Sequence, residues 1–262
     1  MKISSYQQGQ PCWIELASTD AASARHFYAA LFDWGLNDMP IPEGVYTMFT
    51  IDGDDIGAMY QMPPEMSEQG TPTHWGVYFA VDDVQSSAKL VAQQGGKIVM
   101  GPHDVGDAGS MALCQDPEGA HFSLWQAKQH IGSARKDEVN TLCWVELACR
   151  DSAQANAFYT KVLGWQTRVS KMAGMDYTEW TTAAGPQGGM MEMTEEWGDI
   201  PAHWMSYFMV ENCDAAVAKA TELGGQVCVP PTDIETVGRF SVINDPQGGV
   251  FSVITLSPQA AP

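Results

Sequence analysis

The sequence predicts an α+β fold with four βαβββ modules, which form two tandem domains with curved, barrel-like sheets. The first observation is a repeat, because PCWIELASTD at 11–20 returns as LCWVELACRD at 142–151, 131 residues later. The second is that this offset falls to 129 by the His-Trp pairs at 74–75 and 203–204, so the copies differ by only two residues in length. The third is the order of strand, cap and helix within each copy. A fixed long period of this kind indicates a duplicated fold.

The length and the net charge limit the number of domains and the classes of partner that this protein can have. The chain has 262 residues, and we expect a first domain at 8–127, a linker at 128–139 and a second domain at 140–257. The net charge of −19, from 13 basic and 32 acidic residues, would repel phosphate backbones and excludes nucleic acid as a partner. No run approaches the ~20 apolar residues of a membrane span, and the N-terminus has no apolar signal region. We therefore expect a cytoplasmic protein without membrane partners, either a monomer or a homodimer.

The six cysteines are expected to be reduced thiols. They form no Cys-x-x-Cys pair, and a chain of this size without a signal region has no need of disulfides. A zinc site built from thiolates is disfavoured for the same reason. Cys12 and Cys143 share the parity of the helix-covered side of their strands, so we expect buried, unreactive thiols there.

The first copy of the repeat contains two modules. Ser18, Thr19 and Asp20 offer N-cap oxygens to an Ala-rich amphipathic helix at 21–32, and Gly95-Gly96 ends a second helix at 85–94. Residues 63–72, rich in Pro, Gly and Glu, are expected to be a loop. The predicted strands lie at 12–17, 36–39, 46–51, 56–62, 74–81, 97–100, 110–115 and 120–125. The same order repeats from 141 to 255.

Period-two alternation assigns the two faces of each sheet. Ile14 and Leu16 are expected to pack under the helix, so Trp13, Glu15 and Ala17 point to the opposite, concave face. Two modules that pair edge to edge would enclose a cleft on that face. The cleft is the candidate site.

These residues carry a family resemblance. The modules, the helix that ends in Phe-Tyr, the Gly-Gly after the second helix and the Asp-Pro-x-Gly turn before the last strand are similar to the vicinal oxygen chelate (VOC) superfamily. That superfamily includes glyoxalase I, bleomycin resistance proteins and extradiol dioxygenases. The Cys-Trp-x-Glu-Leu opening, with Val237-Gly238-Arg239-Phe240 and Asp245-Pro246-Gln247-Gly248, resembles the tandem 27 kDa antigen type of actinobacteria, which is glyoxalase-like or hydroxylase-like.

The resemblance implies a divalent metal held by side chains on the first, fifth and eighth strands of each copy, but this sequence departs from that pattern. The three positions fall on Trp13, Gly76 and Ser123 in the first copy. In the second copy they fall on Trp144, Met205 and Ser252. Hard divalent ions need several oxygen or imidazole donors that converge. We therefore predict no metal or other cofactor, with a displaced divalent metal as the alternative.

Glu15 and Glu146 are the first candidates for catalytic residues, together with His74 and His203. Each glutamate points into a cleft beside a tryptophan, where burial would raise its pKa toward the range of a general base. The alternative is that it lies at an open mouth of the cleft or pairs with a cation such as Arg239. His74 and His203 share the parity of the cleft side, and an imidazole near a buried Glu would form an acid/base pair. The alternative for them is a structural histidine.

A second set of residues is expected to contact the ligand. Trp13, Trp144, Tyr78 and Tyr207 would give the clefts aromatic walls, which suit flat or apolar ligands, or would simply plug them. The remaining substrate-binding candidates are His121, Ser123, Ser252 and Arg239.

Three functions stay open on this evidence. The first is a metal-free small-molecule binding protein with acid/base chemistry, which as an enzyme would be a glyoxalase-type lyase or isomerase, or a cofactor-independent oxygenase. The second is a sequestering or resistance protein without turnover. The third is a metal-dependent lyase or dioxygenase whose ligands are displaced to Glu15, His74, Glu146 and His203.

Overall fold

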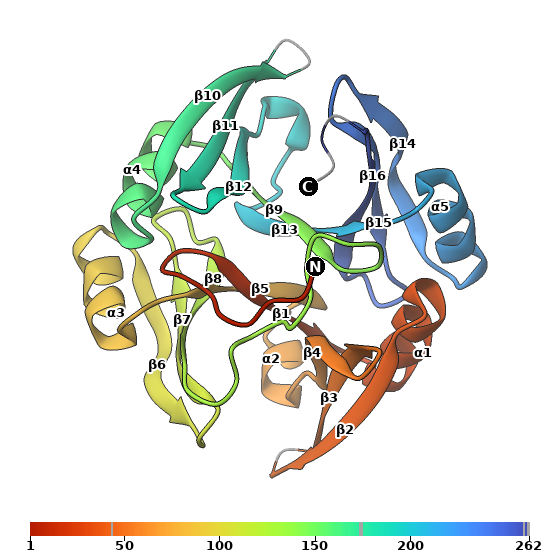
Figure 1. The fold of residues 1–262 in the computed structure, drawn as a ribbon, viewed down its shortest axis with the longest axis horizontal. Coiled ribbons are helices and arrows are strands. Elements are labelled where there is room, and N and C mark those ends of the chain that lie inside the picture. Colours follow the sequence, from red (N-terminus) through yellow and green to blue (C-terminus); the bar gives the residue numbers. More distant parts are fainter. Residues whose placement is uncertain (43, 173–174, 259, 261–262) are drawn as a thin grey trace.

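The computed structural model describes residues 1–42, 44–172, 175–258 and 260, and it contains the four βαβββ modules (Figure 1). Each copy of the repeat forms one eight-stranded mixed sheet. The first sheet has the order β2-β3-β4-β1-β5-β8-β7-β6, and the second repeats it as β10-β11-β12-β9-β13-β16-β15-β14. The α+β prediction is confirmed, and the sheets stay open instead of closing into barrels.

The element bounds follow the sequence closely. In the first repeat they are β1 (Pro11–Ser18), α1 (Ala21–Phe32), β2 (Gly35–Ile41), β3 (Gly44–Ile51), β4 (Asp54–Gln61), α2 (Pro64–Glu68), β5 (His74–Ala80), α3 (Val84–Gln93), β6 (Lys97–Val105), β7 (Gly109–Gln115) and β8 (His121–Ala127). In the second they are β9 (Leu142–Cys149), α4 (Ser152–Val162), β10 (Gln166–Met172), β11 (Met175–Thr182), β12 (Gly185–Glu192), η1 (Glu195–Trp197), β13 (His203–Met209), α5 (Cys213–Glu222), β14 (Gln226–Ile234), β15 (Gly238–Asn244) and β16 (Val250–Leu256).

Two segments differ from the prediction. The stretch expected to be only a loop contains α2, whose first residue is Pro64, because proline is compatible with the first turn of a helix. β6 continues to Val105 instead of ending near residue 100, because irregularities in its pairing with β7 let the strand pass Gly101. Neither difference changes the module order.

The assignment of faces is confirmed for Ile14 and Leu16. Both are buried in the core cluster that contains α1 residues such as Phe27. Trp13 lies in a separate buried cluster on the other side of the sheet, with Met48 and Trp125 among its members. The sheet therefore has one face covered by helices and one concave face that is available for a site.

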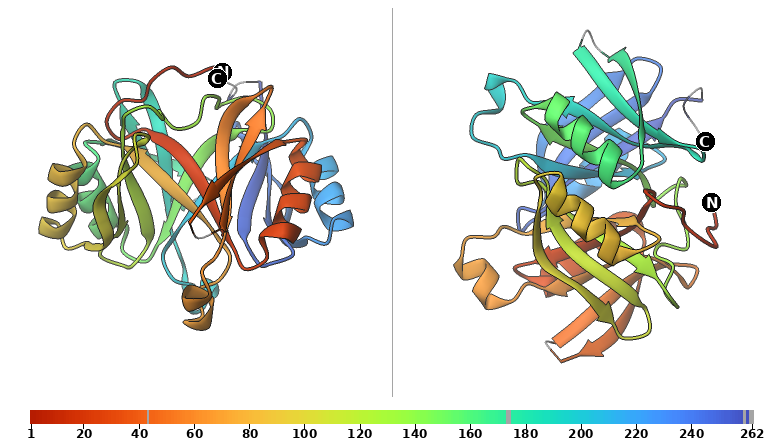
Figure 2. Two further views of the ribbon diagram at one scale, coloured as in Figure 1. Left: turned by 90° about the horizontal axis from the view of Figure 1, so that it is seen from below. Right: turned by 90° about the vertical axis from the view of Figure 1, so that its left-hand side faces the viewer.

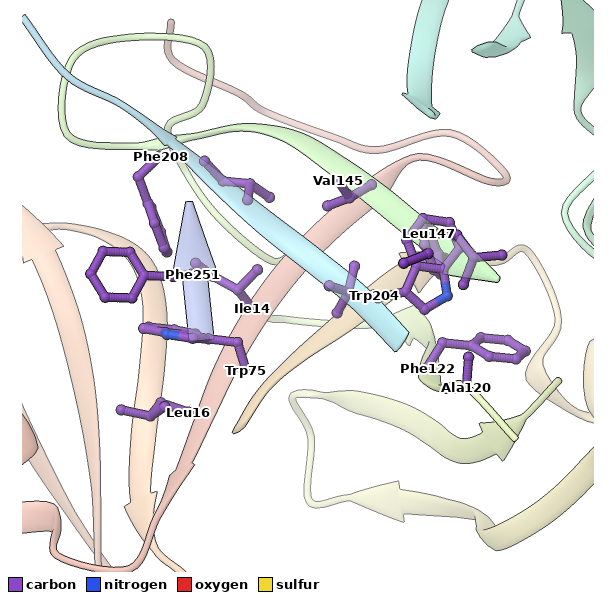
Figure 3. Packing of buried hydrophobic residues seen from close by; sticks show 14 of the residues in the cluster. Ile14, Leu16, Trp75, Ala120, Phe122, Val145, Leu147, Trp204, Phe208 and Phe251 are labelled. Atoms are coloured by element: carbon purple, nitrogen blue, oxygen red, sulfur yellow. The ribbon is translucent and has the colours of Figure 1, made fainter. Parts of the chain in front are cut away.

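The two repeats share one core. α1 packs against α5 and α3 against α4, so each helix pair combines one helix from each repeat (Figure 2). Trp75 of the first repeat lies beside Phe208 of the second, with ring centroids 5.4 Å apart (Figure 3). The helix-covered faces of the two sheets share this core. Their concave faces are therefore directed away from it.

Residues 128–141 connect the sheets without forming a helix or a strand of their own. This connection and the N-terminal segment run beside each other, since Lys2 bridges to Arg135 and the Ile3 amide donates to the Ala134 carbonyl at 2.8 Å. None of the helices in the described ranges is long and apolar enough to cross a membrane.

Candidate ligand-binding site

A carboxylate lies on the concave face of the second sheet. Glu146 comes from β9, in the middle of the strand order. Its Oε1 accepts a hydrogen bond from the Tyr207 hydroxyl at 2.8 Å, and its Oε2 accepts one from the Tyr177 hydroxyl at 2.8 Å. Trp144 Nε1 donates to the Tyr177 oxygen at 2.9 Å. Three neutral aromatic side chains thus form one hydrogen-bonded group with this glutamate.

The backbone explains how Tyr177 reaches the carboxylate. Tyr177 lies on β11, which is separated from β9 by β12. On β12, Gly189 pairs with Glu146, and a Cβ on that glycine would clash with the Tyr177 hydroxyl. The missing side chain leaves the path over β12 free.

The first sheet contains the same arrangement. Glu15 Oε2 accepts from the Tyr46 hydroxyl at 2.6 Å and Glu15 Oε1 from the Tyr78 hydroxyl at 3.0 Å. Trp13 Nε1 donates to the Tyr46 oxygen at 3.3 Å. The two tyrosines on the third strands were not among the sequence-based candidates, although the offset of 131 residues that relates Tyr46 to Tyr177 was available as a signal.

Burial dominates the electrostatics of these groups. It raises the pKa of Glu146 above its ordinary value, while the hydrogen bonds from Tyr177 and Tyr207 lower it in part. Glu15 behaves in the same way, with Tyr46 and Tyr78 as its donors. The pKa of Tyr177 is raised well above 10 by burial and then by the charge of Glu146, so the tyrosines remain protonated donors.

A cavity of about 730 Å³ opens on the concave face of the second sheet. Its size falls within the range of small-molecule sites. The hydrogen-bonded group of Glu146, Trp144, Tyr177 and Tyr207 lies in its wall. Apolar side chains extend the wall, among them Leu142, Met209, Ile234, Val237, Ile254 and Leu256. The cavity combines the half-buried carboxylate of Glu146 with mostly apolar surroundings.

The corresponding cleft of the first sheet is occupied by the chain itself. The His130 ring packs edge-on against Trp13, with centroids 4.6 Å apart, and the His130 carbonyl accepts from Trp125 Nε1 at 2.9 Å. The Ser133 amide donates to the Cys12 carbonyl at 2.7 Å. Tyr6 covers this segment, because its hydroxyl donates to the Ser133 carbonyl at 2.8 Å. The connection between the repeats therefore plugs the first cleft.

The two clefts also differ in polarity. Arg168 and Glu179 line the second cleft and form an ion pair of 2.7 Å, whereas the paired residues at these positions of the first repeat are Asn37 and Met48. Gln187 also lines the second cleft. Its Nε2 donates to the Gly185 carbonyl at 2.9 Å, and its buried Oε1 meets no donor among the described residues. The open cleft is the more polar one.

Several sequence-based candidates lie outside this constellation. His74 and His203 begin their strands, and each Nδ1 lies 2.8 Å from the carbonyl of the proline two residues earlier. His121 is the first residue of β8, and partial burial of its ring, followed by the charge of His74, lowers its pKa. Arg239 pairs with Asp214 at 2.8 Å and Asp233 at 3.0 Å, and not with either glutamate.

Ser123 and Ser252 are buried beside the central tyrosines. In the parallel pairs β5–β8 and β13–β16, Ser123 lies opposite Tyr78 and Ser252 lies opposite Tyr207. The Ser252 hydroxyl is buried and has no hydrogen-bond partner in the part of the chain that the structure describes. The two serines are therefore neighbours of the central tyrosines on the adjacent strand.

The expected position of Cys12 is wrong, and so is that of Cys143, which is half-buried and lines the cavity of the second repeat. Cys12 is buried, and burial raises its thiol pKa, but it belongs to the cluster around Trp13 and not to the helix-covered core. The cause is a break in the register between Pro11 and Trp13, which interrupts the alternation at that residue. The side chain donates to the Tyr78 carbonyl at 3.5 Å instead.

The donor set does not fit a divalent metal. Within the described residues, no three His, Cys, Asp or Glu side chains converge on one point. Glu146 is surrounded by Tyr177, Tyr207 and Trp144, and all three direct hydrogens at the group instead of lone pairs at an ion. Glu146 would therefore be the single protein side chain that coordinates a metal ion at this place.

Comparison with known proteins places these features in a family. The model of the Glyoxalase/Bleomycin resistance protein/Dioxygenase superfamily matches residues 11–124 and again 141–253. The chain is 43% identical over 261 residues to "Putative glyoxylase CFP32" of Mycobacterium tuberculosis, covering 98% of this chain and 99% of that protein. It is 34% identical over 262 residues to "Anthracycline biosynthesis protein DnrV" of Streptomyces peucetius, covering 96% and 94%.

Solved structures confirm the fold. The Mn(II)-bound glyoxalase from Novosphingobium aromaticivorans superposes with a TM-score of 0.65 at 15% identity, covering 98% of this chain and 83% of that chain. The 2,3-dioxygenase LapB from Pseudomonas sp. KL28 gives a TM-score of 0.64 at 16% identity, covering 95% and 93%. At these identities the likeness concerns the fold alone.

Proposed function

Because the chain belongs to the Glyoxalase/Bleomycin resistance protein/Dioxygenase superfamily, we propose that it binds a small, partly apolar molecule in the concave cleft of its second repeat, without a metal ion. The observation that carries this proposal is the cavity of about 730 Å³ around Glu146 and Trp144, set against the plugged cleft around Glu15 and Trp13. One repeat supplies the site, and the other supplies a scaffold that resembles it.

The chemistry of the wall defines the kind of ligand. Trp144, Tyr177 and Tyr207 provide aromatic surface, and Glu146 provides a hydrogen-bond acceptor at a fixed place. A carboxylate has about four lone-pair positions, and the two tyrosine hydroxyls use two of them. A relative is named an anthracycline biosynthesis protein, and a polycyclic aromatic molecule suits such a wall.

Acid/base catalysis is the second candidate function. Burial raises the pKa of Glu146 toward the range in which a carboxylate accepts a proton from a bound substrate. In that case Glu146 would remove the proton, and Tyr177 and Tyr207 would orient the carboxylate. A sequestering protein would bind the same ligand and release it unchanged.

The test uses the repeat as an internal control. A thermal-shift screen supplies a ligand, and calorimetry then compares the parent with Glu146→Gln and Glu15→Gln. We expect Glu146→Gln to weaken binding at least about tenfold, which corresponds to about 1.4 kcal/mol, and Glu15→Gln to bind like the parent. Equal binding by all three proteins would contradict the assignment of the second cleft. Turnover that is lost in Glu146→Gln while binding persists would support acid/base catalysis over sequestration.

Metal analysis tests the other half of the proposal. Protein purified without chelators is expected to contain far less than one zinc, nickel, manganese or iron per chain. About one metal per chain, with ligand binding lost on chelation, would overturn the metal-free proposal and favour a displaced metal site.

A further inference from the structure

One carboxylate in the wall of the second cleft belongs to no ion pair among the described residues. Glu179 pairs with Arg168 at 2.7 Å, and Asp137 pairs with Lys136 at 3.4 Å. The N-terminal ammonium group, which also lies at the cavity, pairs with Glu138 outside the wall. Glu146 has no cationic partner among the described residues, and no charged side chain contributes to the shift of its pKa. Glu146 is therefore the carboxylate of the wall that is left without an ion-pair partner.

The hydrogen-bond directions fix this carboxylate as an acceptor. An indole N–H can only donate, so Trp144 leaves the Tyr177 hydroxyl hydrogen free for Glu146 Oε2. Tyr207 donates to the other oxygen. Both oxygens thus accept hydrogen bonds from protonated tyrosines, which favours the ionised form of Glu146 and offsets in part the effect of burial, which raises its pKa. A ligand group beside it has to donate a hydrogen bond, and an anionic group would be repelled.

The plugged cleft shows which kind of group packs against the tryptophan of the aromatic wall. There the His130 ring packs against Trp13 with an interplanar angle of 89°. Trp144 occupies the matching position in the open cleft, where it lines the cavity. A planar ring that enters the second cleft can make the same edge-to-face contact, since this geometry is favoured between aromatic rings. Aromatic walls also stabilise a nearby cation through the ring quadrupole.

We infer that the second cleft selects an aromatic molecule that carries a protonated amine, with its ring system against Trp144 and its ammonium group at Glu146. The inference rests on the proposed function and names the class of ligand for that site. It excludes acidic ligands such as aromatic carboxylates and glutathione conjugates. Glu146 recognises the amine by its charge, and Trp144 recognises the ring by its flat shape. Tight binding therefore requires both parts of the ligand.

Glu15 shows that such a carboxylate needs no counter-ion in the folded protein. The tyrosines Tyr46 and Tyr78 hold Glu15 in the same way, and among the described residues no cation lies beside it either. A carboxylate with two tyrosine donors is therefore compatible with the folded protein without a counter-ion. The charge of Glu146 acts on whatever enters the open cleft.

Three probes with one ring system test the inference. They are 2-naphthylmethylamine, which is protonated at pH 7, 2-naphthylmethanol, which is neutral, and 2-naphthoate, which is anionic. Calorimetry at pH 7 is run with the parent, Glu146→Gln and Glu15→Gln. We expect the amine to bind at least about tenfold more tightly than the carboxylate, with the alcohol between them. Glu146→Gln should remove this order, and Glu15→Gln should keep it.

The outcomes separate the two proposals. Equal affinity for the amine and the carboxylate, or a preference for the amine that survives Glu146→Gln, would overturn the selection of a cation while leaving the binding cleft in place. Absence of binding by all three probes at millimolar concentration would overturn the proposed cleft, and the inference with it. Raising the salt concentration should weaken the amine most, because charge attraction is screened.

Discussion

At the scale of residues, the directions of the hydrogen bonds in the Glu146 group are fixed, because an indole N–H can only donate and an ionised carboxylate can only accept. Trp144 Nε1 donates to the Tyr177 oxygen, and the Tyr177 hydroxyl donates its own hydrogen to Glu146. The same order joins Trp13, Tyr46 and Glu15 in the other repeat. One copy of this hydrogen-bonded group lies beside a cavity, and in the other the connecting segment packs on Trp13. The two copies make it possible to separate what the group does for stability from what it does for a ligand.

The first prediction concerns the stability effect of the glutamates. Burial raises the folded-state pKa of Glu15 and Glu146 above 4.5. The folded state therefore binds a proton more strongly than the unfolded state, and this contribution is present below about pH 4.5 and is lost as the pH rises through the folded pKa. We expect Glu15→Gln and Glu146→Gln to keep or raise the melting temperature at pH 7. The gain should shrink as the pH falls toward 4.5.

Melting curves between pH 4 and pH 8 measure this effect for both variants and the parent. A loss of several degrees at pH 7 in both variants would show that the carboxylates are structural acceptors for the four tyrosines. The function would then have to be sought around His74, His203 and the tryptophans.

At the scale of elements, the sequence predicted more of the framework than of the site. N-cap oxygens predicted α1, where Asp20 accepts from the Ser23 amide at 3.0 Å, and period-two alternation predicted the faces of Ile14 and Leu16. These are local signals, because a cap acts over three residues and alternation over two. The register break at Cys12 left no such local signal.

The position of the connecting segment in the first cleft could not be predicted from local sequence signals, for a different reason. Residues 128–139 are polar and carry no period, so the sequence indicated a linker without indicating where it lies. Its position depends on contacts between distant residues, such as His130 with Trp13 and Ser133 with Tyr6. The asymmetry of the two clefts follows from this segment, which explains why the sequence treated both clefts as equal candidates.

The second prediction concerns this segment. His130→Ala removes the ring that packs on Trp13, so the amides of Ser133 and Ala134, which donate to the Cys12 and Asp55 carbonyls, should exchange their hydrogens faster. Gln129→Ala is the matched control, because the Gln129 side chain bonds to Asp107 in an exposed position. Hydrogen exchange read by mass spectrometry checks both variants.

The pH dependence of the same exchange has a definite sign. Burial lowers the pKa of His130 below 6.5, and Asp55 opposes this only in part. The contribution of the docked ring is therefore complete above about pH 6.5 and is lost as the pH falls through the folded pKa. After correction for intrinsic rates, exchange at Ser133 and Ala134 should rise from pH 7 to pH 5 in the parent and stay level in His130→Ala. Equal pH profiles in the two proteins would refute the role of the ring.

At the scale of the whole molecule, the repeats exchange hydrogen bonds across their shared core. Tyr28 of α1 donates to Asp245 Oδ2 of the second repeat at 2.8 Å, and Tyr159 of α4 donates to Asp116 Oδ2 of the first at 3.0 Å. Each tyrosine oxygen also accepts from a tryptophan of its own repeat, which is Trp75 at 3.0 Å for Tyr28. The turn that opens the last strand of each sheet is thus held by a helix of the other repeat.

The tryptophans at the ends of α1 and α4 extend this exchange. Trp34 Nε1 donates to the Asn140 carbonyl and Trp165 Nε1 to the Gly9 carbonyl, both at 2.8 Å. All four bonds lie between residues that are far apart in sequence. Because neither half contains the acceptors for its own donors, the two repeats should unfold as one cooperative unit.

The last prediction tests that cooperativity. Tyr28→Phe leaves Asp245 Oδ2 without its donor and the Trp75 N–H without its acceptor, both in buried positions, so it should lower the free energy of unfolding by about 1–3 kcal/mol. Tyr46→Phe is the control, since its hydroxyl bonds to Glu15 within one repeat. In denaturant titrations we expect one transition for each protein. In hydrogen exchange, Tyr28→Phe should loosen the turn at 245–249 in the second repeat, and Tyr46→Phe should leave it protected. If Tyr28→Phe shifted a transition of the first repeat alone and left the turn unchanged, the repeats would be independent domains, and the open and plugged clefts could then be studied as separate proteins.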